Sequence, residues 1–278
     1  MDALFMEAAR ALVPAYGERE ARAVAMLLLE DGFGVRRNDV YAGLVRPFSA
    51  EERGRLAAML RRLAAGEPVQ YVLGRCDFCG RTFGVRPGVL IPRPETEELV
   101  RWVAEAEAGR PLRLLDAGTG SGCIAVTLAL SLPGSRVEAW DVSEEALAVA
   151  RGNARSLGAA VRFVRRDLLA PPPGDAAFDV IVSNPPYVTE RERAEMEPRV
   201  LCHEPATALF VPDDDPLRFY RALAALGRAA LPAGGRMYLE INRAYGPDVC
   251  DLLRASGYAG AELRRDFCGN DRMVRAVR

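Results

Sequence analysis

The sequence predicts an α/β fold: a doubly wound, mainly parallel sheet, preceded by a small helical domain and a β-hairpin linker. Two observations indicate this fold class. From about residue 110 onward, short apolar runs typical of strands alternate with segments of helical length, as in parallel sheets with crossover helices. Residues 1–66 instead carry apolar side chains at helical spacing, and glycines punctuate short runs between residues 68 and 91. A length of 278 residues allows one large domain or two smaller ones.

The first 66 residues are expected to be helical. Apolar residues recur at mixed i, i+3 and i+4 spacing over residues 1–12 and 18–30. A third helix begins at Ser49, which is followed by two glutamates in the first turn, and it ends near Gly66. We therefore place an N-terminal helical domain at residues 1–67.

Short runs that contain glycine follow this domain. Val69–Gly74 and Thr82–Val85 have the composition of short strands, and we predict a β-hairpin linker over residues 68–92. The main domain is expected to span residues 93–278. It opens with an amphipathic helix that has Pro94 in its first turn, where the missing N–H costs nothing.

Within the main domain, strands and helices are expected to alternate, which is the pattern of a doubly wound sheet. The expected strands are residues 112–116, 136–141, 161–165, 178–183 and 235–241. The expected helices are residues 121–131, 144–157 and 216–231.

Charge and composition narrow the classes of function. All 37 basic residues are arginine, and 38 acidic residues bring the net charge to −1. Nucleic-acid-binding proteins usually carry a basic excess, so this balance opposes direct binding to nucleic acid. His203 is the single histidine, which excludes multi-histidine metal sites. A zinc site from Cys76, Cys79, Cys202 and His203 would lack the second paired-cysteine knuckle, and we predict no metal site.

The sequence also favours a cytoplasmic location. The six cysteines are scattered along the chain, as is usual for reduced thiols in a cytosol. No run approaches the ~18 apolar residues of a membrane span, so no membrane association is expected. Early acids and the absence of a basic stretch at the N-terminus oppose a secretory signal.

A glycine-rich turn follows the first strand of the main domain. Residues 114–122 read Leu-Leu-Asp-Ala-Gly-Thr-Gly-Ser-Gly. The glycines allow a ligand to approach the backbone closely, and the helix that follows presents free N–H groups. The G-x-G-x-G spacing differs from the G-x-G-x-x-G of dinucleotide folds, and a plain tight turn remains the alternative.

Two acids at later strand ends sharpen this interpretation. Asp141 ends the second strand, where an acid can accept hydrogen bonds from ribose hydroxyls, and Asp167 follows the third, where a side chain can face adenine. Alternatively, Asp141 caps the next helix and Asp167 pairs with Arg165 or Arg166. Together the three strand ends predict a nucleoside cofactor at the carboxyl edge of the sheet.

The most informative segment is Asn184-Pro185-Pro186-Tyr187, which follows a buried strand. The prolines fix φ and donate no hydrogen bonds, so the Asn184 side-chain oxygen and the Pro185 carbonyl become two fixed acceptors beside the flat wall of Tyr187. Two acceptors suit a planar NH2 group. Accepting both hydrogens stabilises the positive charge that develops as the nitrogen attacks an electrophile, and no strong base is required.

These residues resemble class I S-adenosylmethionine-dependent methyltransferases with a Rossmann-like fold, in the branch that carries Asn-Pro-Pro-Tyr. That branch includes adenine and cytosine amino-methylases, guanine methylases of ribosomal RNA and glutamine-amide methylases of proteins. Four further segments are similar to one family, the peptide chain release factor N5-glutamine methyltransferases (HemK/PrmC family): Gly66–Gly74, Pro87–Glu97, His203–Pro205 and Arg265–Arg272.

The resemblance implies a seven-stranded sheet, S-adenosyl-L-methionine as cofactor and class I peptide chain release factors as substrates. The modified group would be the side-chain amide of the glutamine in a Gly-Gly-Gln motif, and the helical domain would help to recognise the release factor. Thr96 would border the methionine end of the cofactor. The implied cofactor-binding residues are Gly118, Thr119, Gly120, Ser121, Gly122, Asp141, Asp167, Leu168 and Asn184. The implied catalytic residues are Asn184, Pro185 and Tyr187, and the substrate would be bound by these three and Pro186.

Some residues depart from the family pattern, and other functions share parts of it. Phe210–Pro216 replaces a glycine-rich turn, Asn242 stands where glycine is common, and Tyr245 lies near a usual glutamine. The alternatives are a glutamine methyltransferase of a ribosomal protein, a nucleic-acid amino-methyltransferase, a nicotinamide dehydrogenase and an inactive binding module. The glycine spacing opposes the dehydrogenase, and the intact Asn-Pro-Pro-Tyr segment opposes the inactive module.

Overall fold

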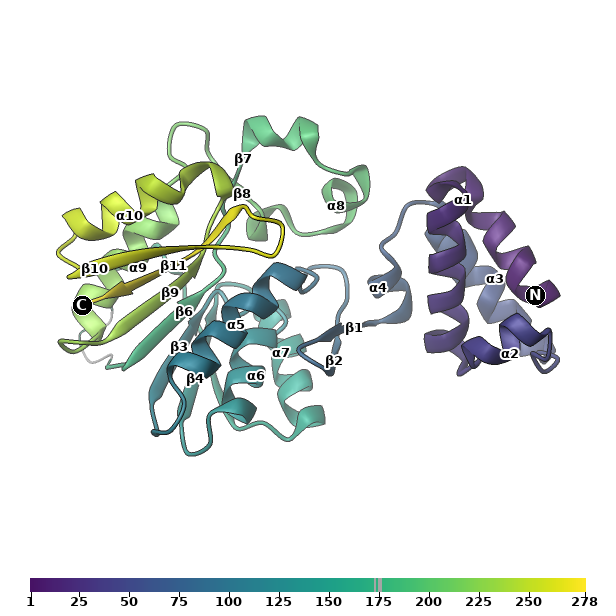
Figure 1. Cartoon of the computed structure of the whole chain (residues 1–278), viewed down its shortest axis with the longest axis horizontal. Coiled ribbons are helices and arrows are strands. Elements are labelled where there is room, and N and C mark those ends of the chain that lie inside the picture. Colours follow the sequence, from purple (N-terminus) through teal and green to yellow (C-terminus); the bar gives the residue numbers. More distant parts are fainter. Residues whose placement is uncertain (173, 175–176) are drawn as a thin grey trace. The chain divides into compact units, whose positions relative to one another are not determined.

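The computed structural model describes residues 1–172, 174 and 177–278, and these divide into two compact units (Figure 1). The helical unit contains Met1–Arg75 together with Glu197–His203. The sheet unit contains Cys76–Met196 and Glu204–Arg278. Among the described residues, no helix combines the length and the apolar character that crossing a membrane requires.

The helical unit is built from five helices in the described chain: α1 (Ala3–Phe33), α2 (Arg37–Ala42), α3 (Ala50–Ala64), α4 (Val69–Leu73) and α8 (Pro198–His203). Gly17, with φ 69° and ψ 167°, breaks α1 into two halves that match the two predicted helices. The helix α3 begins at its N-cap Ser49, as the sequence predicts. Ser49 and Glu52 form a capping box there, because each side chain accepts from the other residue's backbone N–H.

The short helix α8 joins this unit from far along the chain. The Arg199 guanidinium lies 3.7 Å from the centre of the Tyr16 ring, and its Nη1 donates to Glu20 Oε1 at 2.7 Å. Arg199 Nη2 donates to the carbonyl oxygen of Ala15 at 2.6 Å. A single arginine thus satisfies the backbone beside the break in α1 while stacking on an aromatic ring.

One predicted strand is wrong. Val69–Leu73 forms the helix α4, and the hairpin consists of β1 (Arg75–Phe78) and β2 (Arg81–Gly84). Pro68 precedes the helix and Gly74 ends it with φ 73°, donating its N–H to the carbonyl oxygen of Gln70. A five-residue, mostly apolar run is too short for its periodicity to separate helix from strand, so packing of Val72 into the helical core decides.

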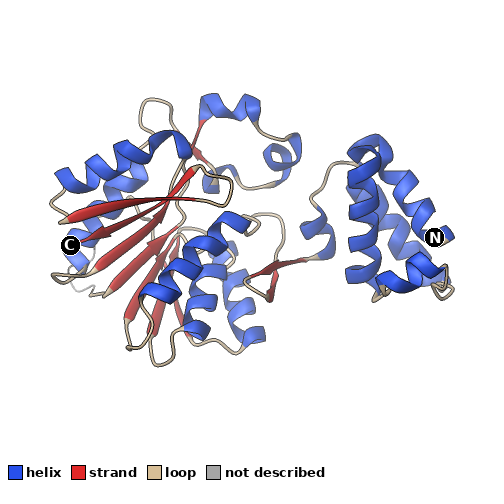
Figure 2. Ribbon diagram, viewed as in Figure 1, coloured by secondary structure: helices blue, strands red, loops and turns tan. Residues whose placement is uncertain are grey.

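The sheet unit holds seven strands in the order β10-β11-β9-β6-β3-β4-β5 (Figure 2). The five predicted strands appear as β3 (Arg113–Ala117), β4 (Arg136–Asp141), β5 (Val161–Arg165), β6 (Val180–Ser183) and β9 (Arg236–Glu240). All of these pair in parallel, whereas β10 (Gly260–Arg265) and β11 (Asp271–Val277) complete the sheet in antiparallel pairs. The doubly wound, seven-stranded expectation is confirmed.

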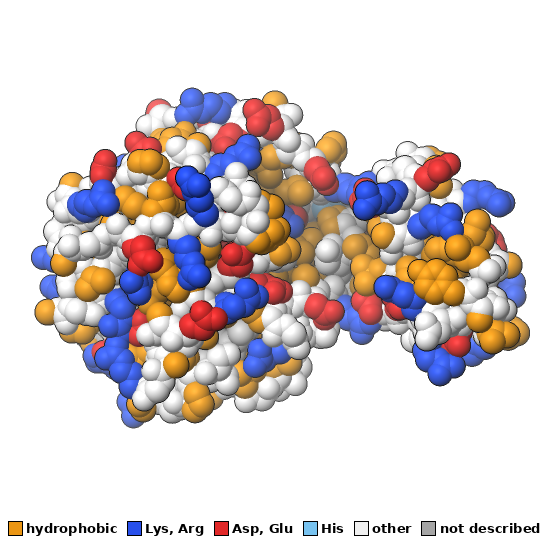
Figure 3. Space-filling model, viewed as in Figure 1, with side chains coloured by type: hydrophobic (Ala, Val, Ile, Leu, Met, Phe, Trp, Pro, Cys, Tyr) orange, Lys and Arg blue, Asp and Glu red, His pale blue; other side chains and the backbone are white. Residues whose placement is uncertain are grey.

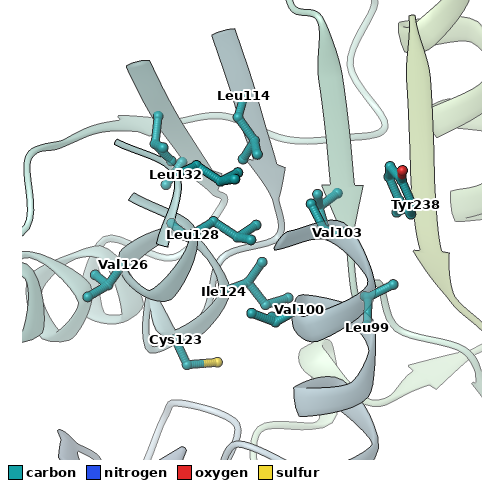
Figure 4. Close-up of a cluster of buried hydrophobic side chains, with 14 of the residues drawn as sticks. Leu99, Val100, Val103, Leu114, Cys123, Ile124, Val126, Leu128, Leu132 and Tyr238 are labelled. Carbon is teal, nitrogen blue, oxygen red and sulfur yellow. The ribbon is translucent and has the colours of Figure 1, made fainter. Parts of the chain in front are cut away.

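Both faces of the sheet are buried. Leu114, Val180 and Tyr238 belong to the core cluster beneath α5 (Pro94–Ala106), α6 (Cys123–Ser131) and α7 (Glu144–Leu157), part of which Figure 4 shows. Their chain neighbours Leu115 and Ile181 belong to a second cluster, with α9 (Arg218–Ala230) and α10 (Gly246–Ala255). Successive strand residues point to opposite faces, which explains why these strands are continuous apolar runs.

Short elements complete the sheet unit. They are β7 (Val188–Thr189), β8 (Phe210–Val211) and the 3₁₀ turns η1 (Glu190–Glu195), η2 (Ala206–Ala208) and η3 (Arg243–Tyr245). On the face shown in Figure 3, arginine and acidic side chains are interspersed rather than separated by sign. This arrangement agrees with the near-zero net charge of the chain.

Candidate active site at the carboxyl edge of the sheet

The glycine-rich turn leaves β3 and enters α6. Gly118 and Thr119 donate their N–H groups to the carbonyl oxygen of Trp140 at 2.9 and 2.8 Å, which ties the turn to the end of β4. Gly122 has φ 82°, and a Cβ atom added there would lie 2.9 Å from the Cβ of Ala150 on α7. Glycine is therefore required at this position both by backbone conformation and by the close approach of α7.

Asp141 lies at the end of β4 and holds the turn from the other side. Its Oδ2 accepts from the N–H of Gly120 at 2.8 Å, and its Oδ1 accepts from the N–H of Ser143 at 2.9 Å. The cap of α7 is Ser143, whose hydroxyl oxygen accepts from Ala146, and not Asp141. Burial raises the pKa of Asp141, although these backbone hydrogen bonds lower it in part.

Asp167 follows β5 and is exposed. Its Oδ1 accepts from the N–H of Leu169 at 2.9 Å. Arg165 and Arg166, its alternative partners from the sequence, donate instead to the carbonyl oxygens of Val142 and Pro171. No hydrogen bond or ion pair joins Asp167 to either arginine among the described residues.

These strand ends surround a cavity of about 400 Å³, a size typical of small-molecule sites. The predicted residues that line it are Thr96, Gly118, Thr119, Gly120, Ser121, Asp141, Asp167, Leu168, Asn184 and Pro186. Three predicted residues, Gly122, Pro185 and Tyr187, do not appear in its lining, and neither does His203. The cavity lies at the carboxyl ends of β3 to β6, where strand order reverses around β3 and where ligands of doubly wound sheets bind.

The Asn-Pro-Pro-Tyr segment begins where β6 ends at Ser183, whose hydroxyl donates to the carbonyl oxygen of Ala117 at 2.5 Å. Asn184 lies on the cavity wall, and its Nδ2 donates to Thr96 Oγ1 at 3.1 Å. Pro185 is buried. The hydroxyl of Tyr187 donates to Glu240 Oε1 at 2.9 Å, and its side chain packs on the core cluster under α9 and α10.

Sequence reasoning missed Glu240, which lies at the end of β9. This carboxylate is 1 % exposed and accepts from both Thr96 and Tyr187. Burial raises its pKa, and burial together with the Glu240 charge raises the pKa of Tyr187. An acid that ends an otherwise apolar buried strand is the signal that could have revealed it, since such a charge needs partners.

Asn242, one of the departures from the family pattern, also holds the segment. Its Nδ2 donates to the carbonyl oxygen of Tyr187 at 3.1 Å and to Glu192 Oε2 at 2.9 Å. Its Oδ1 accepts from the N–H of Ala244 and so caps η3. Within the described chain, no three His, Cys, Asp or Glu side chains gather into a possible metal site.

Comparison with known protein families gives two matches. Residues 96–209 match the methyltransferase small domain, and residues 3–74 match the PrmC N-terminal domain. The first match covers the glycine-rich turn, the acids and the Asn-Pro-Pro-Tyr segment. The second covers most of the helical unit.

Solved structures support the fold. The 16S rRNA N2 G1207 methyltransferase of T. thermophilus, solved with AdoMet and guanosine, superposes with a TM-score of 0.55 at 19 % identity, covering 73 % of this chain and 49 % of that chain. The ribosomal protein L11 methylase of Lactobacillus delbrueckii subsp. bulgaricus gives a TM-score of 0.50 at 20 % identity, covering 70 % and 83 %. At this level of identity they show a shared methyltransferase fold alone.

Sequence relatives are far more similar. The release factor glutamine methyltransferase of Bacteroides thetaiotaomicron is 49 % identical, with 95 % of each chain covered. The enzymes of the same name from Flavobacterium psychrophilum and Bacillus subtilis are 38 % and 42 % identical, covering 96 % and 93 % of this chain and 95 % and 92 % of theirs. The chain therefore belongs to the family of release factor glutamine methyltransferases.

Proposed function

We propose that this protein transfers a methyl group from S-adenosylmethionine to the side-chain amide nitrogen of the glutamine in the Gly-Gly-Gln motif of class I release factors. The observation that carries this proposal is the Asn184 amide on the cavity wall, held through its nitrogen by Thr96, in a chain 49 % identical to a release factor glutamine methyltransferase. A substrate of this kind implies that the protein works in the cytoplasm, where release factors act.

The residues around the cavity fit a cationic nucleoside. Burial raises the pKa of Asp116 to about 7, and its Oδ1 has no hydrogen-bond partner among the described residues. A nearby positive charge would favour the ionised forms of Asp116 and Asp141. Gly118–Ser121, Asp141, Asp167 and Leu168 would hold the cofactor, with Gly122 shaping the turn. Bound S-adenosylmethionine supplies a methyl group activated by a positively charged sulfur.

Asn184 and Pro185 would act on the glutamine amide. Thr96 takes the nitrogen end of the Asn184 side chain, so the oxygen end is left to accept one hydrogen of the substrate NH2 group. The carbonyl oxygen of Pro185 would accept the other. As the nitrogen takes the methyl group, whose bond to the donor sulfur would break at the same time, both acceptors would stabilise the positive charge that grows on nitrogen, and the surplus proton would then leave to water.

Pro186 and Tyr187 would bound the substrate side chain, although their contributions differ. Pro186 lines the cavity, whereas the Tyr187 hydroxyl is turned inward to Glu240. Any role of Tyr187 toward the glutamine is therefore through the position of its ring and backbone. The helical unit, residues 1–67 in the predicted division, would help to hold the release factor.

A competition among acceptors tests the proposal. The protein is incubated with labelled donor and a purified class I release factor, a ribosomal protein or DNA, and the methyl group is located by mass spectrometry. Methylation of the Gly-Gly-Gln glutamine is expected, and a release factor in which that glutamine is alanine should stay unlabelled. Label confined to the ribosomal protein or to DNA would reject the release factor as substrate.

A further inference from the structure

One buried carboxylate holds both ends of the Asn184–Tyr187 segment. Glu240 Oε2 accepts from the hydroxyl of Thr96 at 2.6 Å, and Thr96 in turn contacts the Asn184 side chain. Glu240 Oε1 accepts from the hydroxyl of Tyr187 at 2.9 Å. Thr96 lies on α5, and Tyr187 is the last residue of the segment. Glu240, at the end of β9, therefore joins the two.

With Glu240 ionised, counting protons fixes the direction of these hydrogen bonds. A threonine hydroxyl has one hydrogen, and an ionised carboxylate can only accept. Because the hydrogen of Thr96 is used on Glu240, Thr96 can only accept from Asn184. The partner must then be the amide NH2 group of Asn184, and its Oδ1 lies at the opposite end of the amide.

The surroundings of Glu240 bear on its charge. Burial favours the neutral acid and raises the pKa, whereas the hydroxyls of Thr96 and Tyr187 and the nearby Arg272 lower it. A neutral Glu240 could donate its proton to the Thr96 hydroxyl. Thr96 could then donate to Oδ1 of an Asn184 amide in the reversed orientation. The substrate NH2 group would in that case face another NH2 group instead of an acceptor.

We propose that Glu240 is a positioning residue that sets, through Thr96, which end of the Asn184 amide faces the substrate, and that anchors Tyr187 at the same time. The inference rests on the proposed function, because it concerns the acceptor for the glutamine NH2 group. Glu240 touches neither substrate nor cofactor in this role. It selects one of two amide orientations that are nearly equal in shape but opposite in polarity.

Replacing Thr96 tests the polarity directly. Thr96→Val keeps the shape but leaves Asn184 without its acceptor, so kcat should fall up to about a hundredfold, as for other small misplacements of reacting groups. KM for the release factor should change far less. Thr96→Ser restores the hydroxyl and should restore most of kcat. Equal kcat values for the Val and Ser variants would overturn the proposal.

A matched control separates this effect from loss of a buried threonine. Thr127 on α6 is 2 % exposed, and its hydroxyl has no hydrogen-bond partner among the described residues. Thr127→Val should therefore leave kcat unchanged. A loss of kcat as large as that of Thr96→Val would show a general packing effect and would reject the specific role of Thr96.

A neutron crystal structure of the unaltered protein provides a readout that does not depend on the acceptor. Deuterium is expected on Thr96 Oγ1 toward Glu240 and on Asn184 Nδ2 toward Thr96, with none on Glu240. Asn184 Oδ1 facing Thr96, or a deuteron on Glu240 Oε2, would overturn the inference. Failure of the unaltered protein to methylate the release factor would instead reject the proposed function and leave the neutron result to decide on the network.

Discussion

Replacing Gly122 by alanine tests how the glycine-rich turn is held against α7. Gly122 has φ 82°, a left-handed conformation that costs about 1–2 kcal/mol for a residue with a Cβ. The new Cβ would also lie 2.9 Å from Ala150 Cβ and 3.1 Å from its Cα, and such overpacking costs about 1–3 kcal/mol. We therefore expect Gly122→Ala to lower the free energy of unfolding by about 2–5 kcal/mol.

Gly158, at the end of the same helix α7, offers a matched control. It has φ 70°, but an added Cβ would meet nothing within 4 Å. Gly158→Ala should thus show only the conformational cost of about 1–2 kcal/mol. Both tryptophans, Trp102 and Trp140, lie in the sheet unit, so urea unfolding followed by their fluorescence reports on the unit that contains both substitutions.

Cofactor binding should separate the two variants as well. To relieve the contact with Ala150, the glycine-rich turn of Gly122→Ala must move. If the moved turn loses one hydrogen bond to the cofactor, worth about 1 kcal/mol, binding weakens several-fold. Calorimetry with S-adenosylmethionine should therefore give a higher Kd for Gly122→Ala and an unchanged Kd for Gly158→Ala. Equal losses of stability in the two variants, with equal Kd values, would refute the close approach of α7 as the reason for glycine.

Three further predictions concern Asn184 on the cavity wall and two buried residues, Asp116 and Asn242. Asn184→Ala should bind the cofactor almost normally but lose about 10²- to 10³-fold in kcat, because one acceptor for the developing charge is gone, and an unchanged kcat would contradict its role. Asp116 keeps a proton in the folded state up to about pH 7 that the unfolded chain releases near pH 4. The free energy of unfolding should therefore fall as pH rises through that window, by up to about 1.4 kcal/mol per pH unit more than in Asp116→Asn. If urea unfolding gives parallel pH profiles for the two proteins, Asp116 does not hold this proton. Asn242→Gly leaves the Tyr187 carbonyl and Glu192 Oε1 without their Asn242 donor, while Thr189 still donates to Glu192 Oε2, and it should cost about 1–3 kcal/mol of unfolding free energy. A midpoint equal to that of the unaltered protein would show that Asn242 is not needed there.

Local sequence patterns predicted most elements because their periodicity is repeated over many residues. The strands β4 and β5 coincide with the predicted ranges, since in each of them apolar and polar residues alternate over most of a short segment. The helix α4 was missed because five residues, four of them apolar, fit either period. The strand β10 carries Gly-Ala-Glu-Leu-Arg-Arg at a sheet edge, where few of its side chains are buried, and so gives little apolar signal.

The sequence by itself determined the fold class and the family resemblance, and it predicted the chemistry of Asn184-Pro185-Pro186-Tyr187, because these depend on residue types at short, fixed spacing. Only the tertiary structure decided the direction in which the Asn184 amide points. That direction depends on Glu240 and Thr96, which are 144 residues apart and meet only where α5 and β9 pack together. Hydrogen-bond polarity is a property of groups brought into contact, and no local pattern in the chain records it.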